Sequence, residues 1–190
     1  MQRLKLTPAP VAWRALRRFA LLAVLASCSG HQPSTSLLFA ADETRLDRDQ
    51  QQTIVNAIAE NLPLADDGGS FVDANCGNLE PEATPVDLNG DGVFEVFVQW
   101  GNTCTSGAAG RSLNLYVRDA DGGYRPQFGF PALGWSVRRS RYKEWPDLSF
   151  GGPGFCHPVW TWQHGEYTFM CNRPEAPGGC ADRGNVCMDR

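Results

Sequence analysis

The sequence predicts a mainly β fold. We expect a small antiparallel domain of two similar units, held together by disulfides and preceded by one helix. Three observations lead to this prediction. Apolar residues alternate with polar ones in short runs after residue 87, six cysteines follow residue 75, and one strand-and-turn pattern occurs twice. Alternation with period two is typical of half-buried strands, and an even cysteine set is typical of disulfides in exported proteins.

Residues 1–27 are predicted to be an export signal. Arg14, Arg17 and Arg18 precede the apolar run Phe19–Ala26, which is too short to cross a bilayer permanently. Leu25-Ala26-Ser27-Cys28 resembles a bacterial lipobox, and this resemblance implies cleavage before Cys28 and a lipid on its sulfur. Ser29 after that cysteine implies sorting to the outer membrane of a Gram-negative cell. The alternative is ordinary signal cleavage that leaves Cys28 free.

The chain that remains after residue 27 is acidic. Five of the 17 Lys and Arg residues and none of the 21 Asp and Glu residues precede residue 28, which leaves 12 basic against 21 acidic residues, a net charge near −9. Nucleic acid requires a basic surface, so we expect no nucleic-acid partner. We expect a flexible tether at 28–45 and a single β-rich domain at 46–190.

A helix is expected from Asp47 onward. The apolar residues Ile54, Val55, Ile58 and Leu62 form one stripe at helical spacing, and Pro63 ends the pattern. The helix is expected to pack on a sheet.

The remaining elements are expected to be strands, and they form two copies of one pattern. The first copy has strands at 93–100, 113–118 and 124–130, and the second has strands at 146–150, 159–162 and 167–171. Asp147 takes the place of Glu95, and each copy closes with a glycine turn and a tyrosine, Tyr124 or Tyr167.

The first copy begins with the motif D-x-N-x-D-G-x-x-E at residues 87–95. It offers side-chain oxygens at alternate positions, a glycine where the backbone turns, and a peptide oxygen, which together suit Ca²⁺. The expected ligands are Asp87, Asn89, Asp91, the peptide oxygen of Val93, and Glu95. Position 12 is Val98, so the loop is not an EF-hand. The alternative is a metal-free Asn-Gly and Asp-Gly turn.

This motif, leading into an apolar strand, resembles the calcium loops of FG-GAP and VCBS-type repeats. The resemblance covers about one repeat of the chain. It implies propeller-blade-like units and a metal-binding role for the five loop residues. We expect the calcium to be structural, because the loop leaves no evident open position for a substrate.

The six later cysteines are expected to form three disulfides. They are Cys76, Cys104, Cys156, Cys171, Cys180 and Cys187. Zinc is the alternative, but there is no C-x₂-C pair and the histidines are scattered. We expect Cys156–Cys171 across a hairpin, Cys180–Cys187 in the tail, and Cys76–Cys104 as the remaining pair.

No set of residues in the sequence has the types and spacing of a known catalytic motif, and we expect a protein that is not an enzyme. A basic patch is the candidate partner-binding surface, with the members Trp135, Arg138, Arg139, Arg141 and Lys143. Its alternative is a solvated strand face.

In overall plan the chain is similar to lipoproteins that act as immunity partners or inhibitors of cell-wall hydrolases. The similarity implies a protein partner in the periplasm, such as a secreted cell-wall hydrolase, and attachment to the membrane through the lipid. The alternative is a carbohydrate- or peptidoglycan-binding module that uses tryptophans to stack on sugar rings.

Overall fold

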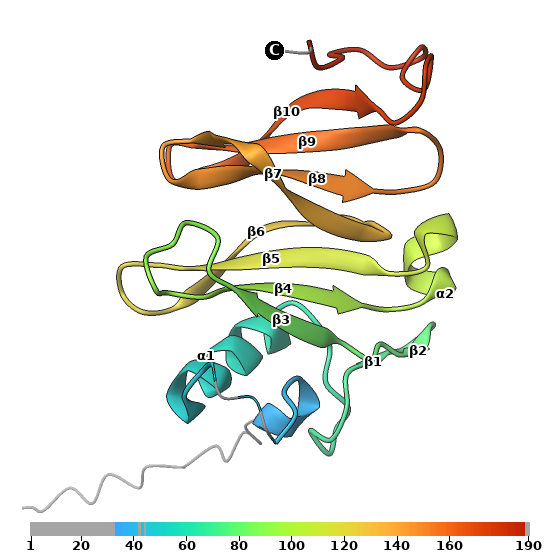
Figure 1. Cartoon of the computed structure of the whole chain (residues 1–190). Helices are drawn as coiled ribbons and strands as arrows, with labels where there is room; N and C mark the ends of the chain where they lie inside the picture. The colour runs from blue at the N-terminus through green and yellow to red at the C-terminus, as the bar shows by residue number, and fades with distance from the viewer. Residues whose placement is uncertain (1–32, 42, 44, 189–190) are drawn as a thin grey trace, which may run out of the picture. The chain divides into compact units, whose positions relative to one another are not determined.

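The computed structural model describes residues 33–41, 43 and 45–188, and it is a mainly β domain (Figure 1). Two four-stranded antiparallel sheets follow the order of the chain, β3-β4-β5-β6 and β7-β8-β9-β10. The first sheet contains β3 (Glu82–Val86), β4 (Glu95–Trp100), β5 (Ser112–Arg118) and β6 (Tyr124–Pro131). The second contains β7 (Gly134–Tyr142), β8 (Trp145–Gly151), β9 (Cys156–Gln163) and β10 (Glu166–Pro174). The other elements are η1 (Thr35–Leu37), α1 (Arg48–Ala59), the pair β1 (Val72–Asp73) and β2 (Gly77–Asn78), α2 (Thr103–Ser106) and η2 (Gly107–Ala109).

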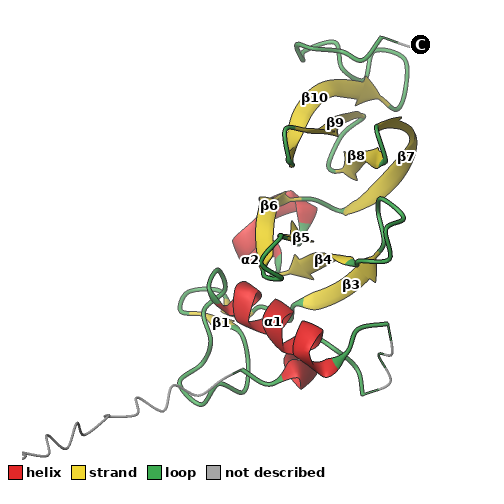
Figure 2. Cartoon of the chain, turned by 90° about the vertical axis from the view of Figure 1, so that its left-hand side faces the viewer, coloured by secondary structure: helices red, strands yellow, loops and turns green. Residues whose placement is uncertain are grey.

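The helix α1 confirms the predicted N-terminal helix. Asp47 caps it: the carboxylate accepts from the Gln50 N–H at 2.8 Å, and the Gln50 side chain accepts from the Asp47 N–H at 2.9 Å. Ile54, Val55 and Ile58 are fully buried, and Figure 2 shows α1 beside the first sheet. This apolar stripe fixes the helix against the sheet.

The first sheet is buried on both faces. Val96 and Val98 pack in the apolar cluster that includes α1, whereas Phe97 between them packs in the cluster shared with the second sheet. Successive side chains of a strand point to opposite faces, so β4 contributes to two cores.

Aromatic side chains fill the space between the two sheets. The Phe97 and Trp135 rings stack with centroids 3.7 Å apart, and Phe128 meets Phe150 edge to face at 4.9 Å. Trp160 and Trp162 of β9 pack against the same cluster. Both sheets therefore share one aromatic core.

The two sheets match strand for strand, and the connections between their strands differ in length. Glu95 pairs with Val86 at the start of β4, and residues 87–94 form the loop between them. In the second sheet Tyr142 pairs with Trp145, and a two-residue turn joins the strands, with Lys143 at a φ of 56°. The expected strand repeat is present, and the second copy lacks the long loop.

The structure extends the predicted organisation at two points. Each sheet has a first strand, β3 or β7, that the sequence pattern did not define. Part of the segment expected to be a tether also belongs to the domain, because Phe39 is 7% exposed and packs in the core with α1. Burial of an apolar ring of this size stabilises the folded domain, whereas a solvated tether would leave the ring in water.

The described residues contain three disulfides, and the expected pairing is right for one of them. Cys76–Cys104 was expected, whereas the other two pairs are Cys156–Cys180 and Cys171–Cys187. The predictions of Cys156–Cys171 and Cys180–Cys187 are wrong.

The strand register explains the correction. Cys156 lies opposite Pro174, and Cys171 lies opposite Val159 beyond a bulge in β10. The two cysteines are therefore three positions apart along the hairpin, too far for a disulfide. Each bonds to the C-terminal tail instead.

Three disulfides are characteristic of a protein that folds in an oxidising compartment outside the cytoplasm. Within the described part of the chain, no helix combines the length and apolarity needed to cross a membrane. The predicted signal and the lipid site on Cys28 lie outside the described residues.

Candidate functional site

The loop between β3 and β4 is organised by its own side chains. The Asp87 carboxylate accepts from the Gly90 N–H at 2.8 Å and from the Gly92 N–H at 3.1 Å. Both glycines have a positive φ, 81° and 84°, which is a backbone conformation that residues with a side chain rarely adopt. The turn residues of the motif therefore bring the backbone around Asp87.

Asn89 and Asp91 hold the next part of the loop. The Asn89 side chain accepts from the Asp91 N–H at 3.0 Å, and Asp91 accepts from the Val93 N–H at 2.7 Å. Asn89 also donates to the other carboxylate oxygen of Asp91 at 2.8 Å. These bonds bring the predicted ligands into one compact loop.

Glu95 closes the loop from the start of β4. Its side chain is 2% exposed and accepts from the Leu88 N–H at 2.9 Å. Burial raises the pKa of Glu95 from 4.5 to about 7; the Leu88 bond opposes this rise, and the charges of Asp91 and Asp87 add to it. A charged Glu95 is therefore costly in this loop without a cation.

The loop contains the types of oxygen that a hard cation binds. Carboxylate oxygens keep a second lone pair after accepting one N–H, so Asp87 and Asp91 remain able to bind metal. A divalent cation beside Glu95 would favour its charged form. Among the described residues, no group of three or more His, Cys, Asp or Glu side chains is arranged to hold a metal. Calcium would therefore also need Asn89 and the peptide oxygen of Val93.

The basic patch expected around β7 is split between two faces of the second sheet. Trp135 points into the interior, where its ring stacks on Phe97. Arg138 and Arg139 line hollows on the opposite face, and Lys143 lies in the β7–β8 turn with its ammonium 5.6 Å from the Tyr142 ring centroid. Arg141 belongs to β7, and its side chain is outside the description.

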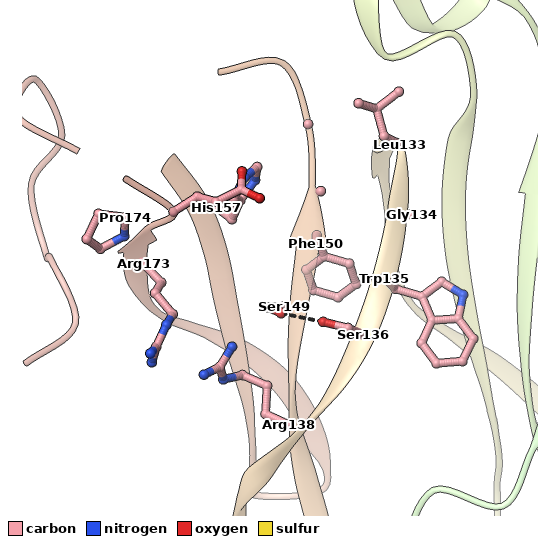
Figure 3. A pocket seen from close by; sticks show the side chains of 13 residues that line it. Leu133, Gly134, Trp135, Ser136, Arg138, Ser149, Phe150, His157, Arg173 and Pro174 are labelled. Carbon is pink, nitrogen blue, oxygen red and sulfur yellow. Dashed lines mark hydrogen bonds and ion pairs between the residues drawn. The ribbon is translucent and has the colours of Figure 1, made fainter. Parts of the chain in front are cut away.

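The outward face of the second sheet carries two adjoining hollows. One has a volume of about 570 Å³ and the other about 790 Å³, and Arg138 and Arg173 line both. Figure 3 shows these arginines extending over the sheet, with Trp135 on the other side of β7. We call this surface the outer groove. Each hollow is large enough for part of a peptide or a small ligand.

Strands β8 and β9 make the floor of the outer groove. Its members are small or polar: Asp147, Ser149, Val159 and Thr161. The Ser149 and Ser136 hydroxyls lie 2.8 Å apart. The tail residues Val186 and Met188 line one side, and the Cys171–Cys187 bond holds this part of the tail against β10.

Asp147 is the residue in the groove that sequence reasoning placed only as a remnant of the metal loop. It is 5% exposed, and its buried Oδ1 atom has no hydrogen-bond partner. Its counterpart Glu95 accepts an N–H from the long loop. The two-residue turn of the second sheet supplies no such loop, which accounts for the missing donor.

In the described part of the chain the five tryptophans are partly buried, and each packs against a hydrophobic cluster. Trp145 and Trp162 stack on each other with centroids 3.9 Å apart, and Trp160 contacts Phe128 and Phe130. Trp100 donates its indole N–H to Asn114 at 2.6 Å. These contacts cover part of each ring and leave less of it for a ligand.

The Cys156-His157 pair does not supply a nucleophile and a base. Cys156 is bonded to Cys180, and His157 Nε2 lies 2.8 Å from Glu175. The buried Nδ1 of His157 has no hydrogen-bond partner.

The comparisons with known proteins give no relative: no family model matches the chain, and no curated protein or solved structure does.

Proposed function

We propose that this chain is an exported, non-enzymatic binding protein that recognises a protein partner through the outer groove. In this proposal a lipid on Cys28 attaches it to a membrane, and calcium at residues 87–95 stiffens the first sheet. A secreted cell-wall hydrolase is the partner class that we favour.

The observation that carries the proposal is the composition of the outer groove. Arg138 and Arg173 border both hollows of a sheet face whose lining mixes polar and apolar side chains. Arginine is enriched where protein partners meet, since its planar group binds carboxylates with two parallel hydrogen bonds. A folded sheet face presents these groups with little loss of backbone freedom on binding.

The carbohydrate-binding alternative has less support. It depends on exposed tryptophan faces, and the stacked pairs Phe97–Trp135 and Trp145–Trp162 cover one face of each of these tryptophan rings. Polar groups alone bind sugars weakly in water, because they exchange one set of hydrogen bonds for another. We therefore place the protein partner first.

The test compares two activities of the purified chain from residue 29 onward, with its disulfides formed. The first assay follows lysis of a cell-wall suspension by each member of a panel of purified muralytic enzymes. The second follows co-sedimentation with purified sacculi. Stoichiometric inhibition of an enzyme supports the proposal. Saturable sacculus binding without inhibition of any enzyme supports the carbohydrate alternative and contradicts the proposal.

A further inference from the structure

The outer edges of the two four-stranded sheets differ in how they are closed. In the first sheet, β3 carries Pro85, which has no N–H, and the carbonyl oxygen of Pro85 accepts from Arg45 Nη1 at 3.1 Å. The other edge strand, β6, carries Pro126 and Pro131. Prolines at an edge hinder pairing with a further strand, because they remove backbone donors.

The edge of β10 in the second sheet is closed by pairing within the chain. Asn172 donates its N–H to the Asn185 carbonyl at 2.6 Å and accepts from the Cys187 N–H at 2.8 Å. Nearer the start of β10, the Tyr167 N–H donates to the side chain of Gln127 at 3.2 Å. The tail and β6 therefore occupy backbone groups of this edge.

β7 is the edge that the described chain leaves open. It is nine residues long, contains no proline and ends the order of the second sheet. Among the described residues, no backbone hydrogen bond joins β7 to a segment other than β8. Residues 134–137 keep a regular register with β8 before the bulge. Alternate residues of such a strand direct N–H and C=O groups outward, where another strand can pair with them.

The charge of β7 decides which strand would pair there. Four basic residues lie in or directly after it: Arg138, Arg139, Arg141 and Lys143. Arg139 and Lys143 are exposed. A second copy of the chain paired at this edge would place like charges beside one another, which is destabilising. A strand with acidic side chains would instead be attracted.

We propose that the partner protein adds an extended acidic segment to the outer edge of β7, as a further strand of the second sheet. The inference rests on the proposed function, and β7 is also a wall of the outer groove. The open edge selects a polypeptide, because an extended chain offers a row of backbone donors and acceptors that a glycan or a lipid headgroup lacks. Val137, which is 46% exposed on this strand, favours a β-branched neighbour between the acids.

The probe is a fluorescein-labelled Glu-Thr-Glu-Val-Glu-Thr-Glu peptide, and fluorescence anisotropy measures its binding. One control peptide carries glutamine in place of glutamate, and a second is N-methylated at every residue, which removes its backbone donors and keeps its charge. Each control should bind about tenfold or more weakly, and binding of the glutamate peptide should weaken as salt is added. Hydrogen exchange should slow in β7 when the glutamate peptide binds, and should not change in β3.

Two proline variants test the pairing itself. Successive residues of a strand direct their N–H groups to opposite edges, so Ser136→Pro and Val137→Pro remove one outward N–H and one N–H that faces β8. The variant with the higher melting temperature is the one that keeps the pairing with β8. It should bind the peptide about tenfold or more weakly, whereas Ser136→Ala and Val137→Ala should change binding less than about threefold.

Charge variants test the choice of an acidic strand. The double variant Arg139→Gln, Lys143→Gln should weaken binding of the glutamate peptide about tenfold and leave binding of the glutamine peptide unchanged. Arg125→Gln is the matched control on β6 of the first sheet, and it should change binding less than about twofold.

Three results would overturn the inference. They are equal binding of the glutamate peptide and its N-methylated form, unchanged hydrogen exchange in β7 with the peptide bound, and concentration-dependent dimers of the free chain that pair through β7. If an enzyme is inhibited equally by wild type and by the better-folded proline variant, the proposed function stands and the inference fails. If no enzyme is inhibited although the peptide binds at β7, the proposed function fails and the edge remains a peptide site.

Discussion

The hydroxyl of Tyr167 donates to the carbonyl oxygen of Pro146 at 2.9 Å, a bond that links β10 to β8 across β9. The first sheet contains the same bond, since Tyr124 donates to the carbonyl of Phe94 at 3.1 Å across β5. In both sheets the acceptor precedes the buried acid, Asp147 or Glu95. The repeated tyrosine therefore fixes the backbone at the point where each acid enters its strand.

Tyr167→Phe should destabilise the domain by about 1–2 kcal/mol, because it leaves the Pro146 carbonyl buried without its donor. Tyr167 is 3% exposed, so water has poor access to replace the bond. Urea unfolding measures the free energy of unfolding. Tyr142→Phe is the control, since Tyr142 is 50% exposed, and it should change stability by less than about 0.5 kcal/mol. Equal effects of the two substitutions would contradict a structural role for the Tyr167 hydroxyl.

Removing calcium should lower the melting temperature. A ligand present at about a hundred times its dissociation constant stabilises the folded state by about 2.7 kcal/mol. For a domain of this size that corresponds to several degrees in melting temperature. EDTA followed by added Ca²⁺, monitored by circular dichroism, measures the change. Asp91→Asn in the loop should abolish the response, whereas Asp121→Asn in the β5–β6 turn should retain it. An unchanged melting temperature in EDTA would refute the metal site.

Glu95→Gln should separate the two states of the loop. The glutamine keeps an oxygen that can accept from the Leu88 N–H, but it removes the charge that burial disfavours. At pH 8 in EDTA the variant should be more stable than wild type, by up to about 3 kcal/mol, because the pKa of Glu95 lies near 7. With calcium the order should reverse. A variant that is less stable in both conditions would show that the charge of Glu95 stabilises the loop without a metal.

Stability should fall in alkali as tyrosines ionise. Burial raises the pKa of Tyr116 from 10.0 to about 12, so the folded state holds its proton more tightly than the unfolded state. The contribution of Tyr116 is fully present below pH 10 and is lost as the pH rises to about 12, by about 3 kcal/mol in total. Urea titrations at pH 9 and pH 11 measure it. Tyr116→Phe should show a smaller fall, and an equal fall in both proteins would contradict the assignment.

Loss of the Cys171–Cys187 bond should release the tail without unfolding the sheets. The bond closes a short segment, with a sequence separation of 16, and its loss should cost about 3 kcal/mol. The double variant Cys171→Ala, Cys187→Ala should be cleaved by protease after residue 180, because Cys156–Cys180 still holds the segment before it, and it should keep its β circular dichroism. The matched double variant at Cys76 and Cys104 should keep the tail protected. Cleavage within β7–β10 would contradict this division.

Sequence reasoning predicted those elements whose signal is local. Asp47 and the apolar stripe of α1 are readable from spacing, and so is the correspondence of Glu95 with Asp147. Strands β3 and β7 were missed for a physical reason. Pro85 lies within β3 and weakens its strand pattern, and the run of arginines in β7 lacks apolar alternation. Only pairing with a neighbouring strand therefore defines β3 and β7.

The candidate site divides in the same way. The loop at residues 87–95 is contiguous, so its ligands were predictable from one motif. The outer groove joins Arg138 on β7 to Arg173 on β10, two strands that lie at opposite edges of their sheet. The disulfides depend on register as well: the bulge between Phe169 and Cys171 shifts the pairing by one residue. A bulge has no reliable sequence signal.

The position of α1 has a consequence for how the domain could grow. α1 and the disulfide-held tail lie over opposite outer faces of the two stacked sheets, as terminal caps do in repeat arrays. Each sheet contacts only its neighbour in sequence, and two residues, Ala132 and Leu133, join β6 to β7. A further four-stranded unit inserted at this junction would meet a sheet face on either side, leaving both caps in place. In the described residues the two sheets are therefore stacked between a helical cap and a disulfide-held cap.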